Sequence, residues 1–418
     1  MIGKRTVIIG NSAAALSAIQ AIRRENSTCP ITLISQEDCY AYSPVLTPFY
    51  LSDRIQERNL FISDKRFYRS ANVVCLLGKE AVEIDPRKQA VVLNDDSKVN
   101  YDYLLIATGA SPKAFDVLDS DTAKGLCYLR TIKDARKIKK LSKQAKEAAI
   151  IGAGLVSMEI ANALYRNDIH LTFIAGSKQV LSQNVDWDCA AIIREEIEAS
   201  CDSSILFGRN VNGIYKEYNK YKLSCDTGEE FAADMVIVGK GVVPNTQLVR
   251  NSGIIINKGV VVDDRLRTNI ENIYAAGDVA EGRNLITGNI EVIPNWVSAC
   301  EQGATAGLNI AEVEAMSAGS INENITQLFG LGIAAIGITK VNDEDNHFEE
   351  LKFMDHERKA YRKLIINGNR LIGAILLGSI QDVGIIRNII VNSVDISPFM
   401  NNLPKIPLDF SRRFLCKS

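Results

Sequence analysis

Two stretches of sequence decide the fold: VIIGNSAAA at residues 7–15 and AIIGAGLVS at residues 149–157. Each begins with a short apolar run that is typical of a buried strand, and each continues into small and apolar residues at helical spacing. A strand that passes through a glycine turn into a helix is the usual start of a βαβ unit. The chain repeats this start, so we predict an α/β protein with two parallel sheets.

Both turns have the composition of a dinucleotide-binding loop. The first glycine permits the bend, a small second residue lets the backbone approach a pyrophosphate, and a small third residue lets helix and strand pack closely. The helix N-terminus presents free N–H groups to the phosphates. The residues at these places are Gly10, Ser12, Ala14 and Ala15 in the first turn, and Gly152, Gly154 and Ser157 in the second. A plain strand-to-helix turn is the alternative for either one alone, whereas the pair predicts two Rossmann-like dinucleotide-binding domains.

An acidic residue after the second strand of such a unit normally accepts hydrogen bonds from a ribose. In the first unit Glu37 has this place, and a solvated loop carboxylate is the alternative. In the second unit the strand runs into residues 175–178, which contain no acid. Lys178 is either a partner for a 2′-phosphate or a surface lysine. The choice between NAD and NADP therefore stays open.

Composition excludes several classes of protein. A length of 418 residues suggests two or three domains, and a net charge of −2 argues against a general nucleic-acid binder. The N-terminus leads directly into a strand, so no signal peptide is expected, and the apolar stretch 328–338 is too short to span a membrane. Nine scattered cysteines without a CxxC spacing, and only three histidines, predict a cytoplasmic protein without a metal site.

Five motifs occur in an order that resembles the pyridine nucleotide–disulfide oxidoreductase superfamily of flavoproteins. They are GNSAAA at 10–15, ATG at 107–109, GAGLVSME at 152–159, GKGVVPN at 239–245 and AGD at 276–278. The resemblance implies FAD on the first unit and a nicotinamide dinucleotide on the second. It also implies that Asp278 bonds the FAD ribityl chain and that Glu159 orients the nicotinamide half, with a helix-surface glutamate as the alternative. The further residues implied at the FAD site are Val82, Thr108, Gly109 and Gly277, and Gly241 is implied at the NAD(P) site.

The resemblance also implies three domains. The FAD-binding domain is discontinuous and comprises residues 1–112 and 245–320, with the NAD(P)-binding domain at 113–244 between its parts. Residues 321–418 form a small C-terminal α+β domain, because a hairpin is expected around Asn367 and Gly368 and a helix from Val383 to Val391. Relatives use this last domain at interfaces, so its hairpin is a candidate surface for a homo-oligomer or a heteromeric complex, with simple packing of its apolar residues as the alternative.

The segment 40–51 corresponds to the flavin-facing segment of the superfamily, where disulfide reductases carry redox-active cysteines. No cysteine lies between Cys39 and Cys75. The chain is therefore similar to the branch without these cysteines, which includes rubredoxin reductase, the nitrite reductase large subunit and the FAD/NAD-binding subunits of iron–sulfur oxidoreductases. Ser43, Pro44 and Trp296 are the flavin-facing candidates, although many relatives have arginine in place of Pro44, and Trp296 is equally suited to the core.

These observations predict an FAD-dependent NAD(P)H oxidoreductase, with NADH weakly favoured over NADPH. Hydride passes between nicotinamide and flavin, for which no protein acid or base is required, and electrons pass between the flavin and an iron–sulfur protein or subunit. The alternatives are a free-standing NAD(P)H oxidase or small-molecule reductase, and a redox-sensing flavoprotein without rapid turnover. Residues 134–148 are expected to form a lysine-rich helix. The basic side chains between residues 133 and 146 are either a docking face for an acidic partner or a solvated helix face.

Overall fold

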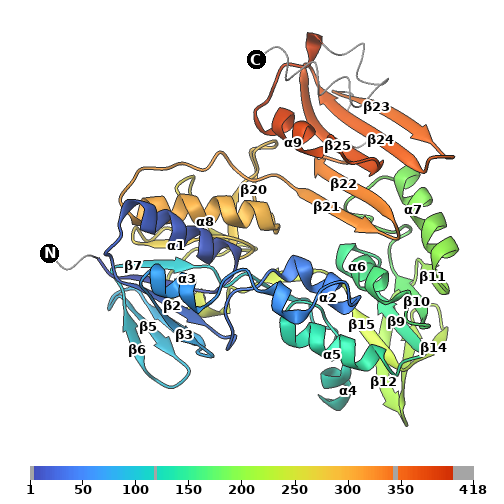
Figure 1. The fold of residues 1–418 in the computed structure, drawn as a ribbon, viewed down its shortest axis with the longest axis horizontal. Helices are drawn as coiled ribbons and strands as arrows, with labels where there is room; N and C mark the ends of the chain where they lie inside the picture. The colour runs from blue at the N-terminus through green and yellow to red at the C-terminus, as the bar shows by residue number, and fades with distance from the viewer. Residues whose placement is uncertain (1–3, 117–119, 342–346, 399–418) are drawn as a thin grey trace. The chain divides into compact units, whose positions relative to one another are not determined.

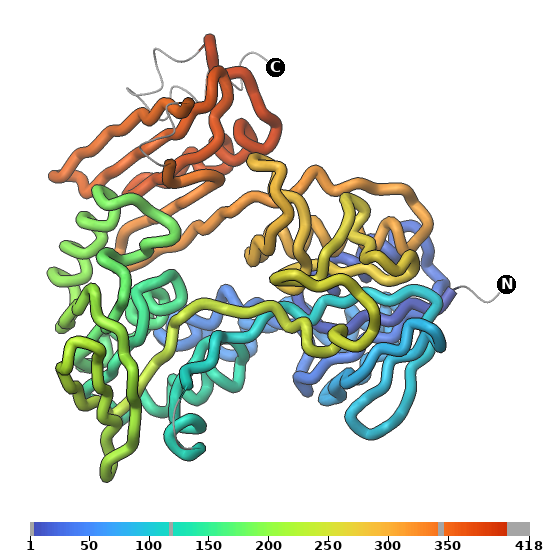
Figure 2. Tube along the Cα trace, turned by 180° about the vertical axis from the view of Figure 1, so that it is seen from behind, coloured from blue at the N-terminus to red at the C-terminus, as the bar shows by residue number. Residues whose placement is uncertain are grey.

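The computed structural model describes residues 4–116, 120–341 and 347–398, and it divides the chain into two compact units. Unit 1 comprises Met1–Leu46, Ile55–Ser111 and Val242–Ile321. Unit 2 comprises Thr47–Arg54, Pro112–Gly241 and Asn322–Ser418. Figures 1 and 2 show the elements of each unit from opposite sides. Each unit is thus assembled from three separate segments, and the three-domain boundaries given above remain a prediction.

A parallel sheet of five strands, in the order β18-β7-β1-β2-β3, lies at the centre of unit 1. Ile8 of β1 pairs with Leu105 of β7, and both side chains are fully buried, as expected for strands covered on both faces. The strands are β1 (Thr6–Ile9), β2 (Ile31–Ser35), β3 (Val73–Leu77), β7 (Tyr103–Ile106) and β18 (Ile273–Ala275). The parallel βαβ organisation predicted from residues 7–15 is therefore correct.

Two helices, α1 (Ala13–Glu25) and α8 (Trp296–Ile310), pack side by side in unit 1 (Figure 1). Their backbones approach so closely that only glycine fits at two positions of α8. A Cβ atom at Gly303 would lie 2.2 Å from the Ala14 carbonyl oxygen, and one at Gly307 would lie 2.6 Å from that of Ala18. This contact fixes α8 against the helix that opens at the first glycine turn.

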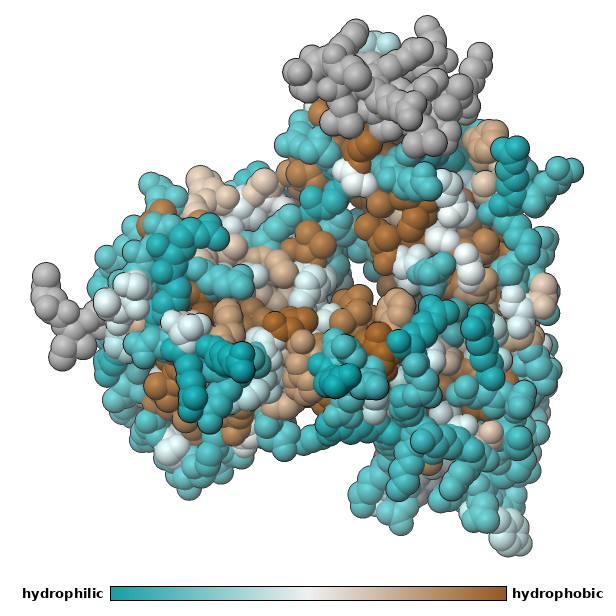
Figure 3. All heavy atoms as spheres, in the orientation of Figure 1, coloured by the Kyte–Doolittle hydropathy of each residue, from teal (hydrophilic) through white to brown (hydrophobic). Residues whose placement is uncertain are grey.

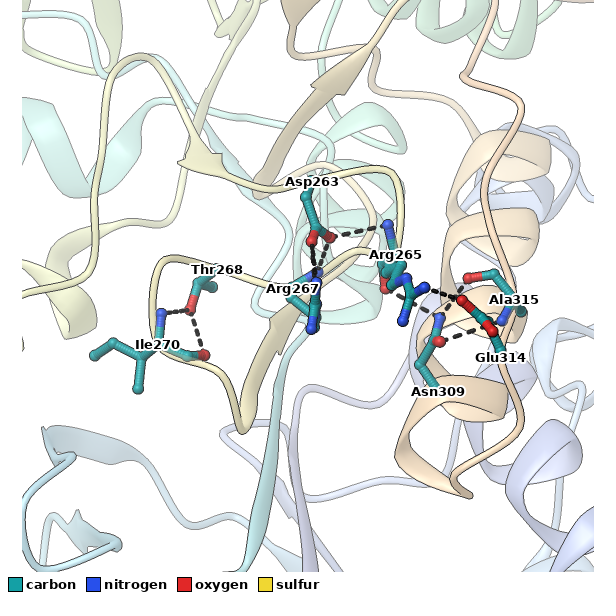
Figure 4. Close-up of polar contacts among 8 residues, drawn as sticks. All are labelled: Asp263, Arg265, Arg267, Thr268, Ile270, Asn309, Glu314 and Ala315. Carbon is teal, nitrogen blue, oxygen red and sulfur yellow. Dashed lines mark hydrogen bonds and ion pairs between the residues drawn. The ribbon is translucent and has the colours of Figure 1, made fainter.

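The C-terminal end of α8 is held by the loop that precedes β18 (Figure 4). The Asn309 side-chain amide donates to the Arg265 carbonyl at 3.2 Å and to the Ala315 carbonyl at 2.8 Å. Arg265 also pairs with Glu314, while Asp263 accepts hydrogen bonds from the Arg267 backbone and guanidinium groups. Arg265 therefore ties the start of the loop to the end of α8, while Asp263 and Arg267 hold the loop to itself.

The remaining elements of unit 1 are short. The antiparallel sheet β4-β5-β6 contributes Ile84, Val91 and Leu93 to the same core as the parallel sheet. The other elements are η1 (Pro44–Leu46), η2 (Glu57–Leu60), α3 (Lys65–Ser70), β4 (Ala81–Asp85), β5 (Ala90–Leu93), β6 (Lys98–Asn100), β8 (Ala110–Pro112), β16 (Val242–Pro244), η3 (Gln247–Val249), β17 (Val260–Val261), β19 (Ala280–Arg283) and β20 (Ile290–Glu291).

Unit 2 contains the second parallel sheet, in the order β11-β10-β9-β15. Its strands are β9 (Glu147–Ile151), β10 (His170–Ala175), β11 (Ser203–Phe207) and β15 (Met235–Val238), and its longer helices are α5 (Ile132–Ser142), α6 (Leu155–Leu164) and α7 (Trp187–Ser200). A single helix over 134–148 was expected, and this was wrong at its C-terminal end. The helix ends at Ser142 because β9 begins at Glu147 and buries Ala148 between two neighbouring strands.

A three-stranded antiparallel sheet and two short helices complete this part of unit 2. They are β12 (Val211–Glu217), β13 (Lys220–Cys225), β14 (Glu230–Ala233), α2 (Thr47–Leu51) and α4 (Ser120–Gly125). The sheet alternates between buried and exposed residues, as a sheet with one solvated face does. Figure 3 accordingly shows mainly polar residues over β12 and β14.

The C-terminal part of unit 2 is a five-stranded antiparallel sheet in the order β21-β22-β25-β24-β23, followed by a helix. Its elements are β21 (Glu323–Leu328), β22 (Leu331–Gly337), β23 (Phe348–Asp355), β24 (Ala360–Asn367), β25 (Arg370–Gly378) and α9 (Val383–Val391). The predicted hairpin at Asn367 and Gly368 and the predicted helix are both present. Side chains of β22 and β25 share one core with α6 and β9. None of the helices in the described ranges has the length and apolarity needed to cross a membrane.

Candidate functional site

The first glycine turn connects β1 to α1 in unit 1. Gly10 has a φ of +119°, and a Cβ atom there would lie 2.0 Å from the Ala107 carbonyl oxygen, so no other residue fits without moving the backbone. Ser12 is the N-cap of α1, yet its side chain makes no capping hydrogen bond, and the first turn carries no acidic residue. The N-terminal N–H groups of α1 are therefore not capped by a side chain of Ser12.

The second turn connects β9 to α6 in unit 2 and has the same construction. Gly152 has a φ of +102°, and a Cβ atom there would lie 2.5 Å from the Gly239 carbonyl oxygen. Gly154 is the N-cap of α6, and a Cβ atom on it would meet nothing within 4 Å. Ser157 is fully buried, and a Cβ atom at Gly239 would lie 2.1 Å from its hydroxyl oxygen. The glycine at 152 serves the bend, whereas the glycine at 154 leaves open space in front of the helix.

Several other helices have side-chain caps, although α9 also lacks one. Thr131, Asp186 and Asn295 accept hydrogen bonds from first-turn N–H groups of α5, α7 and α8, respectively. The two helices that follow the glycine turns lack such a cap, although an uncapped N-terminus is less stable. A pyrophosphate would satisfy these N–H groups and the positive end of each helix dipole. The residues present at both turns thus fit a dinucleotide.

A carboxylate lies beyond β2, as predicted, and the structure adds the residue that orients it. The Tyr42 hydroxyl lies 3.1 and 2.9 Å from the two carboxylate oxygens of Glu37, and Tyr42 itself is buried. A second tyrosine supports the glycine turn, because the Tyr68 hydroxyl donates to the Asn11 side chain at 2.6 Å. Sequence reasoning included Tyr42 in the segment 40–51 but foresaw neither its contact with Glu37 nor that of Tyr68 with Asn11, since nothing in the local sequence indicates these partners.

The corresponding place after β10 contains no carboxylate. The strand ends at Ala175, and a Cβ atom at Gly176 would lie 2.3 Å from the Asn210 side-chain oxygen, so a larger residue at 176 would displace Asn210. Lys178 is exposed. Neither feature distinguishes a ribose from a ribose 2′-phosphate.

The motifs at residues 107–109 and 276–278 lie together in unit 1, at the carboxyl ends of adjacent strands. Ile106 of β7 pairs with Ala275 of β18, so Thr108 and Gly109 follow one strand while Gly277 and Asp278 follow the other. This is the sheet edge at which ligands of open α/β sheets bind.

Two further side chains hold these ends; sequence reasoning did not identify Gln302, and it included Asn245 only as the last residue of the motif at 239–245. The Gly277 N–H donates to the side-chain oxygen of Gln302 at 2.8 Å, and Gln302 is buried on α8. The Asn245 side chain donates to the Thr108 carbonyl at 2.8 Å, while the Thr108 hydroxyl donates to the Asn245 carbonyl at 2.9 Å. Because these contacts join segments far apart in sequence, no local pattern reveals them.

Glu159 lies in α6, five residues after Gly154, the N-cap of this helix. Burial raises the pKa of its carboxyl to about 7, and a hydrogen bond from the Thr326 hydroxyl at 3.3 Å opposes this rise. Gly241, the other residue predicted here, is exposed with a φ of +87°. A carboxyl that titrates near neutral pH is uncommon outside binding and catalytic sites.

The flavin-facing candidates differ in exposure. Ser43 is buried and its N–H donates to the Leu60 carbonyl, whereas Pro44 begins η1. Trp296 begins α8, is half-buried and packs against the core of unit 1. Val82 is 50% exposed beside an irregularity in β4. These placements leave the roles of the four residues as predictions.

Some lysines of helix α5 are engaged in contacts within unit 2, which leaves fewer of them to bind an acidic partner. The Lys137 ammonium donates to the Lys124 and Leu126 carbonyls, and Lys139 lies over the Tyr50 ring, donates to the Tyr50 carbonyl and pairs with Asp53. Two lysines of this helix therefore hold neighbouring segments of unit 2.

The two glycine turns, each at the carboxyl edge of a parallel sheet, define a protein with two dinucleotide sites. Comparison with known proteins gives the family. Residues 4–303 match the pyridine nucleotide-disulphide oxidoreductase family and residues 324–394 match the rubredoxin NAD+ reductase C-terminal domain. The chain belongs to the pyridine nucleotide-disulphide oxidoreductase family and is an NAD(P)H-dependent flavin oxidoreductase. The predicted family, fold class and dependence on FAD and NAD(P)H are confirmed.

Three similar proteins cover most of the chain. The epsilon subunit of the NADH-dependent phenylglyoxylate dehydrogenase of Aromatoleum evansii is 29% identical over 99% of this chain and 97% of its own length. An NADH oxidase of Methanocaldococcus jannaschii is 30% identical over 80% of this chain and 76% of its own length. The crystal structure of the covalent putidaredoxin reductase–putidaredoxin complex covers 100% of both chains with a TM-score of 0.89 at 20% identity, which supports the fold.

Proposed function

We propose that the chain exchanges electrons between a nicotinamide nucleotide and an iron–sulfur protein, as a subunit or partner of a larger redox complex. The observation that carries this proposal is the pair of uncapped helix N-termini after positive-φ glycines, combined with a segment between Cys39 and Cys75 that contains no thiol. Without a thiol in that segment the flavin must pass its electrons directly to another carrier. The similarity to a dehydrogenase subunit supports a complex.

FAD is assigned to unit 1 and the nicotinamide nucleotide to unit 2. In unit 1 the N-terminus of α1 takes the pyrophosphate, Glu37 held by Tyr42 accepts from a ribose, and Asp278 accepts from the ribityl chain. In unit 2 the N-terminus of α6 takes the second pyrophosphate across Gly154, and Glu159 accepts from the carboxamide of the nicotinamide. The flavin is proposed to lie against Ser43, Pro44 and Trp296.

The bound cofactors supply the hydride exchange. The residues of the chain bind and orient the two nucleotides, and an aligned approach of the reacting atoms supplies most of the acceleration. No side chain has to donate or accept a proton for this exchange. The proposed compartment is the cytoplasm, supported by the eight cysteines of the described ranges, which are all free thiols.

A free-standing NADH oxidase is the second candidate function, favoured by the similarity to such an enzyme. Purification of the chain from its native source distinguishes the two. The proposal predicts that an iron–sulfur protein co-purifies in fixed ratio and is reduced by NADH through this chain. A chain that purifies alone and turns over rapidly with oxygen as its sole acceptor contradicts the proposal and supports the oxidase.

A further inference from the structure

One hydrogen bond joins the second dinucleotide helix to the C-terminal sheet. The Thr326 hydroxyl of β21 donates to a carboxylate oxygen of Glu159 on α6 at 3.3 Å, across 167 positions of sequence. Both residues belong to unit 2. The bond is of interest because Thr326 lies in the segment that matches the rubredoxin NAD+ reductase C-terminal domain, outside the nucleotide-binding motifs.

The register between β21 and α6 is fixed independently of this bond. Asn162, one turn after Glu159 on α6, donates to the Gln327 carbonyl at 3.3 Å and accepts from the Phe329 N–H at 2.7 Å. The Phe329 ring also packs against Tyr165, with ring centroids 5.3 Å apart. Asn162 therefore holds the backbone on both sides of Leu328, and this places Thr326 opposite Glu159.

We propose that Thr326 is a positioning residue for the nicotinamide site: its hydroxyl holds the Glu159 carboxylate in one orientation and favours its charged form, so that it accepts a hydrogen bond from the carboxamide. The inference rests on the proposed assignment of the nicotinamide nucleotide to unit 2. It gives the C-terminal domain a part in coenzyme binding in addition to the interface role expected from the sequence.

The electrostatics of the site explain why such a bond matters. Burial raises the pKa of Glu159 to about 7, so near neutral pH a small change decides whether the carboxyl is charged. A hydrogen bond to the ionised form lowers a carboxyl pKa. Of the elements that pack closely against α6, β21 carries Glu323, which pairs with Arg387, and α2 carries Tyr50, whose ring lies against the Lys139 ammonium. Thr326 is the hydrogen-bonding partner that favours the charged form of Glu159.

The direct test is a pH titration of Glu159 in the full-length holoprotein. Glutamate side chains are labelled with ¹³C at the carboxyl carbon, and the Glu159 resonance is identified as the one that disappears in Glu159→Gln. Thr326→Val keeps the shape of the side chain and removes the hydroxyl, whereas Thr326→Ser keeps the hydroxyl. We expect the midpoint to rise by about one pH unit in Thr326→Val and to stay unchanged in Thr326→Ser. Gln327→Ala, at an exposed neighbour on the same strand, is the matched control. An unchanged midpoint in Thr326→Val overturns the proposal, and so does an equal shift in Gln327→Ala.

The second readout is the dissociation constant of NAD⁺ measured across the same pH range. In Thr326→Val the affinity should fall severalfold at neutral pH, and the loss should vanish when Glu159→Gln is also present. A loss that persists in the double variant means that Thr326 acts on the coenzyme by another route and overturns the proposal. If wild-type chain binds no nicotinamide nucleotide at all, the proposed function fails, while the carboxyl titration still decides whether Thr326 controls Glu159.

Discussion

Gly154→Val separates the binding role of the second glycine turn from its role in folding. Gly154 has a φ of −82° and a ψ of −177°, an extended conformation that valine adopts readily, and a Cβ atom there meets nothing within 4 Å. The folded chain therefore accommodates the new side chain. The loss of a glycine N-cap costs about 1 kcal/mol of stability. We expect the variant to fold, retain its yellow colour and unfold at a slightly lower temperature.

The effect on the nicotinamide nucleotide is expected to be much larger. The valine methyl groups occupy the space through which a pyrophosphate approaches the N-terminal N–H groups of α6, so the favourable contacts with that helix end are lost. An anion at a helix N-terminus contributes up to about 2 kcal/mol, and a hydrogen bond to a charged group contributes about 1.5–3 kcal/mol. A loss of about 3 kcal/mol raises the dissociation constant roughly a hundredfold.

The assay is the quenching of flavin fluorescence by NAD⁺, combined with measurement of bound FAD after gel filtration. The control is Gly152→Ala, in which the added Cβ atom would lie 2.5 Å from a backbone oxygen at a φ of +102°, so that folding itself should suffer. Normal NAD⁺ affinity in Gly154→Val would refute the assignment of the coenzyme to this turn. Loss of FAD from Gly154→Val with NAD⁺ binding retained would mean that the two sites are reversed.

Three further predictions concern stability and FAD binding. Gly303→Val should destabilise the chain by about 3 kcal/mol, because its Cβ atom would lie 2.2 Å from the Ala14 carbonyl oxygen; a denaturant midpoint equal to that of the wild type would contradict the close helix contact. Glu37→Ala should weaken FAD binding by about 2 kcal/mol and Tyr42→Phe by less, as measured by reconstitution of the apoprotein with FAD. If Glu37→Ala binds FAD as tightly as the wild type, Glu37 makes no contact with the ribose. The third concerns pH: burial raises the pKa of Glu159 to about 7, so the unfolded chain loses this proton first as pH rises, and the folded state loses stability between the ordinary glutamate pKa and pH 7. Glu159→Gln should therefore be as stable as the wild type at pH 4 and more stable than the wild type at pH 8, by about 3 kcal/mol; a stability difference between variant and wild type that is the same at both pH values would contradict the raised pKa.

The sequence predicts the two parallel sheets well because their strands are short, apolar and followed directly by glycine turns. It predicts less of the C-terminal sheet. The hairpin of β24 and β25 has an Asn-Gly turn between apolar runs, whereas β23 is an edge strand with a mixed pattern of charged and aromatic residues. The end of α5 was also placed too late, because residues 143–148 continue a helical composition, whereas the pairing of β9 with β10 begins at Glu147.

Local sequence likewise identifies some residues of the candidate site and not others. Residues within the motifs, such as Gly10 and Gly152, are identified by local sequence because a positive φ requires glycine. The side chains that orient the site are not identified. Gln302 reaches Gly277 across 25 positions and Thr326 reaches Glu159 across 167, and such pairs appear only when the fold brings the segments together.

Hydride is proposed to pass from the nicotinamide to the flavin without a thiol as intermediate. This step can be followed by mixing the yellow holoprotein anaerobically with NADH and recording the flavin absorbance in a stopped-flow instrument. We expect rapid bleaching to the two-electron-reduced flavin, with the same rate after all accessible cysteines have been alkylated. Flavin that stays oxidised for minutes with both NADH and NADPH, or bleaching that alkylation abolishes, would contradict it.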